Sequence, residues 1–253
     1  MINTDAYDVD ILVQGFPGKS VCHGTLGWST IALLRGQGRV ALIDVGGFGI
    51  RDTLVERLAA VGLKPADVTD VLLSHCHHDH ALNWPMFKDA RIVISGVEMD
   101  WGLNEPWGFT PVPEFTVEKL SDWPTLARAN HGDEVLPHIH AHIAPGHTPG
   151  GLVYVLSDKD FDVVFTGDAA KNRAELLSGT VGLCHDRAAS VETLEMIWDL
   201  WQARPGSVLV PGHDLPMTQV DRVPIYLGER EAGILAWFDG DLEQTTIVRL
   251  ERT

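Results

Sequence analysis

Histidines and an aspartate are concentrated in one short segment, His75-Cys76-His77-His78-Asp79-His80, directly after the apolar run 71–73. If that run is a β-strand, alternate side chains share a side, so His75 and His77 face together while Cys76 points away. A turn then brings Asp79 and His80 close by. Neutral imidazole and carboxylate groups suit a borderline divalent ion such as zinc. The pattern therefore predicts a metal site at a strand end.

Other predicted strands also end in histidine or aspartate next to glycine. Gly146-His147 follows the run 138–142, Gly167-Asp168 follows 163–165, and Gly212-His213 follows 207–210. In a sheet-based fold such strand ends can meet at one edge, so residues far apart in the chain can form one site. Asp44, at the end of the run 40–43, has two open interpretations: a group that orients a ligand histidine, or a turn residue.

Short apolar segments alternate with helical patterns along the chain. Strands are predicted at 11–13, 30–34, 40–43, 71–73, 91–95, 138–142, 152–156, 163–165, 207–210 and 245–250, and helices at 50–61, 81–87, 171–177, 188–201 and 225–238. We interpret 138–142 as an edge strand whose histidines face outward, not as a source of metal ligands. The alternation is typical of a layered α/β fold.

The segment 99–131 lacks a clear period and is rich in tryptophan and proline. Long loops inside compact domains are usually functional, and the aromatic residues argue against disorder. The sequence predicts an ordered flap over the site. The alternatives are a surface excursion with its own small core and a contact in a homodimer.

Composition limits the class of protein. A chain of 253 residues with 45% hydrophobic residues predicts a single domain over 1–253. A net charge of −16 argues against nucleic acid as a partner. The acidic N-terminus, without a long apolar run, does not resemble a secretory leader or a membrane anchor, and Cys22, Cys76 and Cys184 do not form a disulfide pattern. We expect a cytoplasmic protein with reduced cysteines.

Together these motifs resemble the metallo-β-lactamase superfamily, whose signature is His-x-His-x-Asp-His, a Gly-His, a bridging aspartate and a second Gly-His. The resemblance extends from about residue 30 to 214 and includes Asp44. It implies a four-layer αβ/βα sandwich that holds two divalent metal ions. Zinc is the first choice, and manganese and iron are the alternatives. By that pattern one ion takes His75, His77 and His147, the other takes Asp79, His80 and His213, and Asp168 bridges them.

The resemblance implies hydrolysis of a small carboxylic ester or lactone by a metal-bridging hydroxide. Asp79 would be catalytic, either steadying an ion or carrying a proton to the leaving group. The alternatives are a thioesterase of the glyoxalase II type, a mononuclear iron dioxygenase and a binding protein without turnover. Lactonases of this superfamily place a tyrosine shortly after the bridging aspartate, whereas Asp168 is followed by Ala-Ala-Lys-Asn-Arg. This departure argues against cleavage of quorum-signal lactones, though not of esters or lactones in general.

The substrate is expected to be a small molecule, and whether it is anionic is left open. Lys171 and Arg173 follow the aspartate in an otherwise acidic chain and can pair with a substrate carboxylate, although they can equally cap or solvate the following helix. Trp101 and Trp107 can supply an apolar wall, but a tryptophan is more often part of the core.

Overall fold

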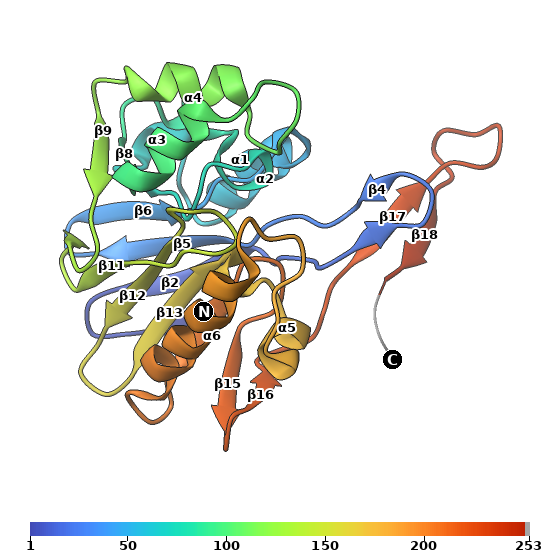
Figure 1. The fold of residues 1–253 in the computed structure, drawn as a ribbon. Coiled ribbons are helices and arrows are strands. Elements are labelled where there is room, and N and C mark those ends of the chain that lie inside the picture. Colours follow the sequence, from blue (N-terminus) through green and yellow to red (C-terminus); the bar gives the residue numbers. More distant parts are fainter. Residues whose placement is uncertain (251–253) are drawn as a thin grey trace.

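Two seven-stranded sheets lie face to face in the computed structural model, which describes residues 1–250 (Figure 1). The first has the spatial order β1 (Ile2–Asn3), β2 (Asp8–Val13), β5 (Ile31–Gly36), β6 (Arg39–Ile43), β7 (Asp70–Leu72), β8 (Arg91–Ser95) and β9 (Leu126–Ala129). The second has the order β10 (Glu134–Leu136), β11 (Ile139–Ile143), β12 (Leu152–Ser157), β13 (Asp162–Gly167), β14 (Val208–Pro211), β15 (Met217–Val220) and β16 (Val223–Tyr226).

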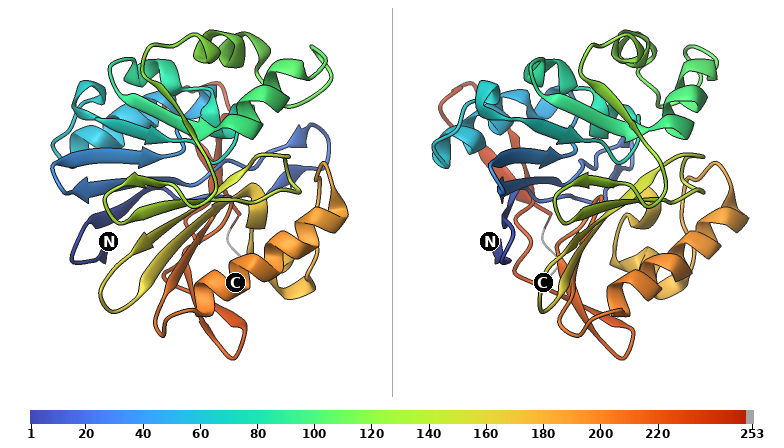
Figure 2. Two further views of the ribbon diagram at one scale, coloured as in Figure 1. Left: turned by 60° about the vertical axis from the view of Figure 1, so that its left-hand side comes forward. Right: turned by 90° about the vertical axis from the view of Figure 1, so that its left-hand side faces the viewer.

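Helices cover the outer face of each sheet (Figure 2). The α-helices are α1 (Arg51–Ala60), α2 (His78–Ala81), α3 (Gly96–Asn104), α4 (Glu114–Ser121), α5 (Arg173–Ser178) and α6 (Arg187–Gln202). The 3₁₀ turns are η1 (Phe48–Ile50), η2 (Pro65–Asp67), η3 (Trp84–Phe87) and η4 (Asp168–Ala170). One buried cluster fills the space between the sheets, and two others pack the helices onto the outer faces. This confirms the predicted four-layer αβ/βα sandwich.

Burial explains why the central strands read as continuous apolar runs. Five of the six residues of β12 and all six of β13 are buried, because both faces of the sheet are covered. In α6 the apolar stripe packs inward through Leu194, Ile197 and Trp201. The side chain of Asp186 caps this helix by accepting hydrogen bonds from its first N–H groups.

Strand direction decides where the histidine-bearing loops lie. β6 and β7 run parallel in the first sheet, and β13 and β14 run parallel in the second. β11 has the same direction as β13, because each pairs antiparallel with β12. Their carboxyl ends therefore share one edge of the second sheet.

Among the hydrogen bonds between the sheets at this edge, two hold the end of β7. The N–H of Leu152 donates to the carbonyl of Ser74 over 2.7 Å. The hydroxyl of Tyr154 donates to the carbonyl of Leu73 over 2.8 Å, at a position where both residues are buried. The end of β7 is thus fixed against β12.

Replacing Tyr154 with phenylalanine should lower the free energy of unfolding by about 1–3 kcal/mol, since the buried Leu73 carbonyl would lose its donor. Tyr7→Phe is the matched control: Tyr7 is equally buried, but its hydroxyl has no hydrogen-bond partner. Urea unfolding of both variants measures the difference. Equal stability of the two variants would contradict this role of the Tyr154 hydroxyl.

The segment 99–131, which shows no clear period in the sequence and was expected to be an ordered flap, contains regular elements. Two helices and a strand, α3, α4 and β9, occupy most of it, and the prolines fall mainly in the connection between the helices. The helices form because Ser95 caps α3 and because Met99, Val117 and Leu120 pack into the core on that side of the first sheet. Closely spaced Trp and Pro residues interrupt the helical spacing of apolar residues in the sequence.

Two further element predictions need correction. The strand at 138–142 is not an edge strand, because β11 lies between β10 and β12. Its histidines are nevertheless outside every metal-type cluster found in residues 1–250. The predicted helix 81–87 is instead α2, which starts earlier at His78, followed by η3.

The predicted closing helix 225–238 is wrong as well. Its residues form β16 and β17 (Gly233–Ala236), and β17 pairs with β18 (Thr246–Arg249). Asp221 and Arg222 both have positive φ angles and form the two-residue turn of the β15–β16 hairpin. The β17–β18 pair projects from the sandwich near the short hairpin of β3 (Lys19–Ser20) and β4 (Gly24–Thr25) (Figure 1). Over residues 1–250, no helix combines the length and apolar character needed to cross a membrane.

Candidate metal centre

Seven ligand-type side chains meet where the edges of the two sheets approach each other. They come from the loop after β7, from α2, from the loop after β11, from the start of η4 and from the loop after β14. Three groups have ligand atoms within 4.8 Å of one another: His75 with His77 and His147, His75 with His80 and Asp168, and Asp79 with His80 and His213. The structure therefore brings together every residue that the sequence predicted as a metal ligand.

The local geometry of the first motif differs from the prediction. β7 ends at Leu72, so His75 and His77 lie in a loop, and Asp79 and His80 lie in a helical turn. The two loop histidines still face each other, with ring centroids 4.6 Å apart. Cys76 points away from them, as predicted, and is fully buried in the core.

Asp168 occupies the centre of the cluster. Its Oδ1 lies 3.1 Å from Nε2 of His80 and 3.2 Å from Nε2 of His213, and its Oδ2 lies 3.3 Å from Nε2 of His147. Gly212 makes this position accessible, because a Cβ atom there would lie 2.4 Å from Asp168 Oδ1. The glycine before the last histidine thus has a steric reason.

Hydrogen bonds orient four of the five histidines from behind. Nδ1 of His147 donates to the carbonyl of Leu183 over 3.0 Å, and Nδ1 of His213 donates to the carbonyl of Trp28 over 2.9 Å. The other two histidines are held through Asp44 and Ser74, as described next. Fixing one ring nitrogen determines which nitrogen faces the centre, as metal-binding histidines require.

Asp44 is the group that holds His75 and His80. Its Oδ2 accepts a 2.7 Å hydrogen bond from Nδ1 of His80, and another of 2.7 Å from the hydroxyl of Ser74. The Ser74 oxygen in turn lies 3.0 Å from Nδ1 of His75. Of the two interpretations left open by the sequence, the structure supports an orienting group, which also lies at a turn with φ of 56°.

The charge distribution divides the cluster into two halves. On the side of the three histidines, burial lowers the pKa of His77 to about 3 and that of His147 to about 4, which favours the neutral imidazole. Burial opposes a charged His213, but Asp168 raises its pKa to about 9. Burial alone would raise the pKa of Asp79, yet His80 and His213 bring it below its usual value. The carboxylates of Asp79 and Asp168 thus favour positive charge in the half that contains His80 and His213.

The donor set fits divalent metal ions. Nε2 of His75 and Oδ1 of Asp168 are buried and take part in no hydrogen bond, although other polar atoms surround them. A buried polar atom without a partner is costly, and coordination to a cation would satisfy both of these atoms. Imidazole nitrogens together with carboxylate oxygens are ligands that zinc accepts.

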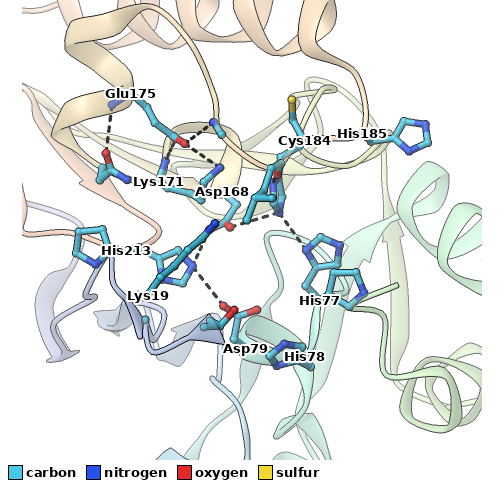
Figure 3. A pocket seen from close by; sticks show the side chains of 18 of the residues that line it. Lys19, His77, His78, Asp79, Asp168, Lys171, Glu175, Cys184, His185 and His213 are labelled. Carbon is cyan, nitrogen blue, oxygen red and sulfur yellow. Dashed lines mark hydrogen bonds and ion pairs between the residues drawn. The ribbon is translucent and has the colours of Figure 1, made fainter. Parts of the chain in front are cut away.

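A cavity of about 590 Å³ opens next to the cluster (Figure 3). Asp79, Trp101 and Lys171 line it. Nζ of Lys171 lies 3.0 Å from Oε1 of Glu175, so a carboxylate of the protein itself already pairs with this lysine. Glu175 also accepts hydrogen bonds from the N–H groups of Lys171 and Gly182, which fixes the wall of the cavity.

Two predicted substrate contacts do not line this cavity. Trp107 is 53% exposed and packs its ring against Phe115. Arg173 donates through Nε to the carbonyl of Pro224, and its guanidinium lies over the ring of Tyr226. The structure thus gives no support for Trp107 or Arg173 as a substrate contact.

Sequence reasoning missed most of the cavity wall. Phe16, Pro17 and Lys19 come from the β3–β4 hairpin region, and Leu183, Cys184 and His185 come from the loop before α6. The only sequence signal was the glycine-rich character of the first region, where Gly15, Gly18, Gly24 and Gly27 are closely spaced. Nothing in that signal indicates which side chains reach the site.

Comparisons with known proteins place the chain in a family. The family model described as the metallo-beta-lactamase superfamily matches residues 24–213. Metallo-beta-lactamase domain-containing protein 1 of Rattus norvegicus is 29% identical over 181 residues, which are 71% of this chain and 63% of that protein. The chain thus spans less than two thirds of this relative's length.

Lactonases are also among the similar proteins. An N-acyl homoserine lactonase of Bacillus thuringiensis is 24% identical over 183 residues, 70% of this chain and 68% of the lactonase. The solved structure of AidC, described as a dizinc quorum-quenching lactonase, superposes with a TM-score of 0.67 at 19% identity, covering 90% of this chain and 93% of AidC. At that identity the superposition shows a shared fold.

Proposed function

The chain belongs to the metallo-beta-lactamase superfamily, and we propose from this premise that it is a dinuclear zinc hydrolase of a small carboxylic ester or lactone. One observation carries the proposal: seven ligand-type side chains from both halves of the chain meet beside a cavity, with Asp168 between their two halves. Manganese or iron could occupy the same ligands, since availability selects among these metals.

The position of each residue indicates the role that it would have. His75, His77 and His147 would hold one ion, Asp79, His80 and His213 the other, and Asp168 both. Two bound zinc ions would supply Lewis acidity and a water activated at neutral pH. Asp79 lines the cavity and its side chain is 22% exposed, so its carboxylate can reach a substrate and take or give a proton at the leaving group.

The cavity supports a substrate with an apolar part and a polar end. Phe16, Pro17 and Trp101 give it an apolar wall, while Lys19 and Lys171 are the cations among its lining residues. The lactonase relatives favour a lactone or ester bond. No tyrosine is among the described residues that line the cavity, which supports substrates other than quorum-signal lactones.

A substrate screen tests the proposal directly. The zinc-loaded protein would be assayed against simple esters, lactones, thioesters and a quorum-signal lactone, before and after chelation. We expect ester or lactone hydrolysis that disappears with the metal and returns with zinc. Preferred thioester cleavage would favour the glyoxalase II alternative, and metal-dependent oxygen uptake without hydrolysis would favour a dioxygenase.

Lys19→Ala should raise KM for substrates that carry a carboxylate about two- to fivefold, with little change for neutral analogues, because an exposed charge contact contributes ~0.5–1 kcal/mol. Lys171 should contribute less, since Glu175 already neutralises it. Lys88→Ala is the matched control: it removes the same charge from an exposed position outside the cavity. Unchanged discrimination between charged and neutral substrates would remove Lys19 from the site.

A further inference from the structure

Glu98 is a fully buried carboxylate in the first turn of α3, a helix that carries none of the candidate metal ligands. Burying a carboxylate is costly unless strong hydrogen bonds compensate for the lost water. Both of its oxygens accept such bonds from backbone N–H groups, as set out below. These hydrogen bonds therefore stabilise the two backbone segments that donate them.

The Glu98 carboxylate bridges two loops that carry histidines of the cluster. Its Oε1 accepts a 3.0 Å hydrogen bond from the N–H of Cys76, the residue between His75 and His77. Its Oε2 accepts a 3.1 Å hydrogen bond from the N–H of Gly150, three residues after His147. One side chain thus fixes the spacing between the loop after β7 and the loop after β11.

Ser95 completes the contact on the second loop. Its hydroxyl donates to the carbonyl of Gly150 over 2.5 Å and accepts the N–H of Glu98 over 2.9 Å as the cap of α3. Both backbone polar groups of Gly150 are therefore held by the first turn of one helix. The packing leaves no room for a side chain, because a Cβ atom on Gly150 would lie 2.2 Å from the Glu98 nitrogen.

His77 depends on this arrangement more than the other histidines. In the described residues 1–250, the one hydrogen-bonding contact of its imidazole ring is Nδ1 to Nε2 of His147 at 3.0 Å, whereas the other four rings have Nδ1 held from behind. The ring of Trp101, also on α3, packs edge-on against it at 5.9 Å. The position of the His77 ring is thus set by its backbone, which the start of α2 and the Cys76–Glu98 hydrogen bond hold, and by Trp101 of α3.

We propose that Ser95 and Glu98 form a clamp that positions His77 and His147 as one half of the metal site. The clamp residues are positioning residues, because they touch the ligand loops and not the cavity. This inference rests on the proposed dinuclear centre. It adds that the affinity of one metal position is set from α3, outside the family motifs.

Glu98→Gln tests the clamp, because an amide keeps the shape but can accept only one of the two N–H groups. Wild-type and variant protein loaded with Co²⁺ would be titrated with a chelator while retained metal and the visible absorption spectrum are followed. We expect the variant to release one of its two ions at least about tenfold more readily, with an altered Co²⁺ spectrum, and to hold the other normally.

Asp70→Asn is the matched control: Asp70 is equally buried but pairs with Arg39 and Arg91, away from the ligand loops. It should hold both ions normally. Ser95→Ala serves if Glu98→Gln does not fold, with a smaller loss expected at the same position. Identical retention and spectra in the clamp variants and the wild type would overturn the inference, whereas a wild type that holds no metal would overturn the dinuclear centre itself.

Discussion

Asp168→Ala is expected to abolish hydrolysis, lowering kcat/KM by roughly a thousandfold or more, and to leave the protein with little bound metal. The reason is the central position of its carboxylate, which lies within 3.3 Å of ring nitrogens from His80, His147 and His213. In the proposed dinuclear centre, removing it would take a ligand from both metal positions at once. A thousandfold loss corresponds to ~4 kcal/mol of transition-state stabilisation, a contribution within reach of metal ions.

Elemental analysis of the purified variant and kinetics on the best substrate of the screen measure the two effects separately. Asp162→Asn is the matched control, because Asp162 lies at the other end of the same strand, β13, is also buried, and pairs with Arg204 instead of the cluster. It should keep both metal and activity. An Asp168→Ala protein that retains two ions, or full activity, would contradict the central role of this carboxylate.

Most of the site could be predicted from the sequence because each ligand carries a local signal, although the ligands are spread from residue 75 to 213. His75 to His80 are close in sequence, and His147, Asp168 and His213 each follow a glycine near a predicted strand end. The glycine before His213 has a steric origin in the structure, where it admits the Asp168 carboxylate. Spacing alone does not predict which residues bind the same metal ion. That assignment came from the resemblance to a family.

The residues of the cavity wall could not be predicted from the sequence. Lys19 and Leu183 line the cavity because two loops, far apart in the sequence, fold over the same sheet edge. Their positions depend on tertiary contacts such as the stacking of Phe16 on Trp28. Trp107 had the right chemistry for a wall but lies on the outer side of the α3–α4 connection, packed on Phe115.

Errors in the secondary structure have similar physical causes. The apolar residues between 225 and 238 predict a helix, yet Ile225, Ile234 and Leu235 are exposed in hairpins. Local pattern matching assumes that an apolar stripe faces a core, and here no core covers it. In 99–131 the opposite occurred, since helices α3 and α4 pack well although prolines and tryptophans obscure their period.

Asp44→Asn is expected to weaken binding of both metal ions about 10- to 100-fold, the usual effect of losing a partner behind a ligand histidine. Asparagine tolerates the left-handed backbone at this position, where φ is 56°, so the chain should still fold. The loss would come from the charge and from the hydrogen bonds to His80 and, through Ser74, to His75.

The same chelator titration distinguishes Asp44 from the clamp on α3. Asp44 reaches a histidine in each half of the cluster, so both ions should be released more readily, whereas Glu98→Gln should weaken only one. Asp70→Asn, at the start of the neighbouring strand β7, is the control for loss of a buried carboxylate. If Asp44→Asn kept both ions at wild-type affinity, Asp44 would be a turn residue alone, and the rings of His75 and His80 would have to be held by the metal and by packing.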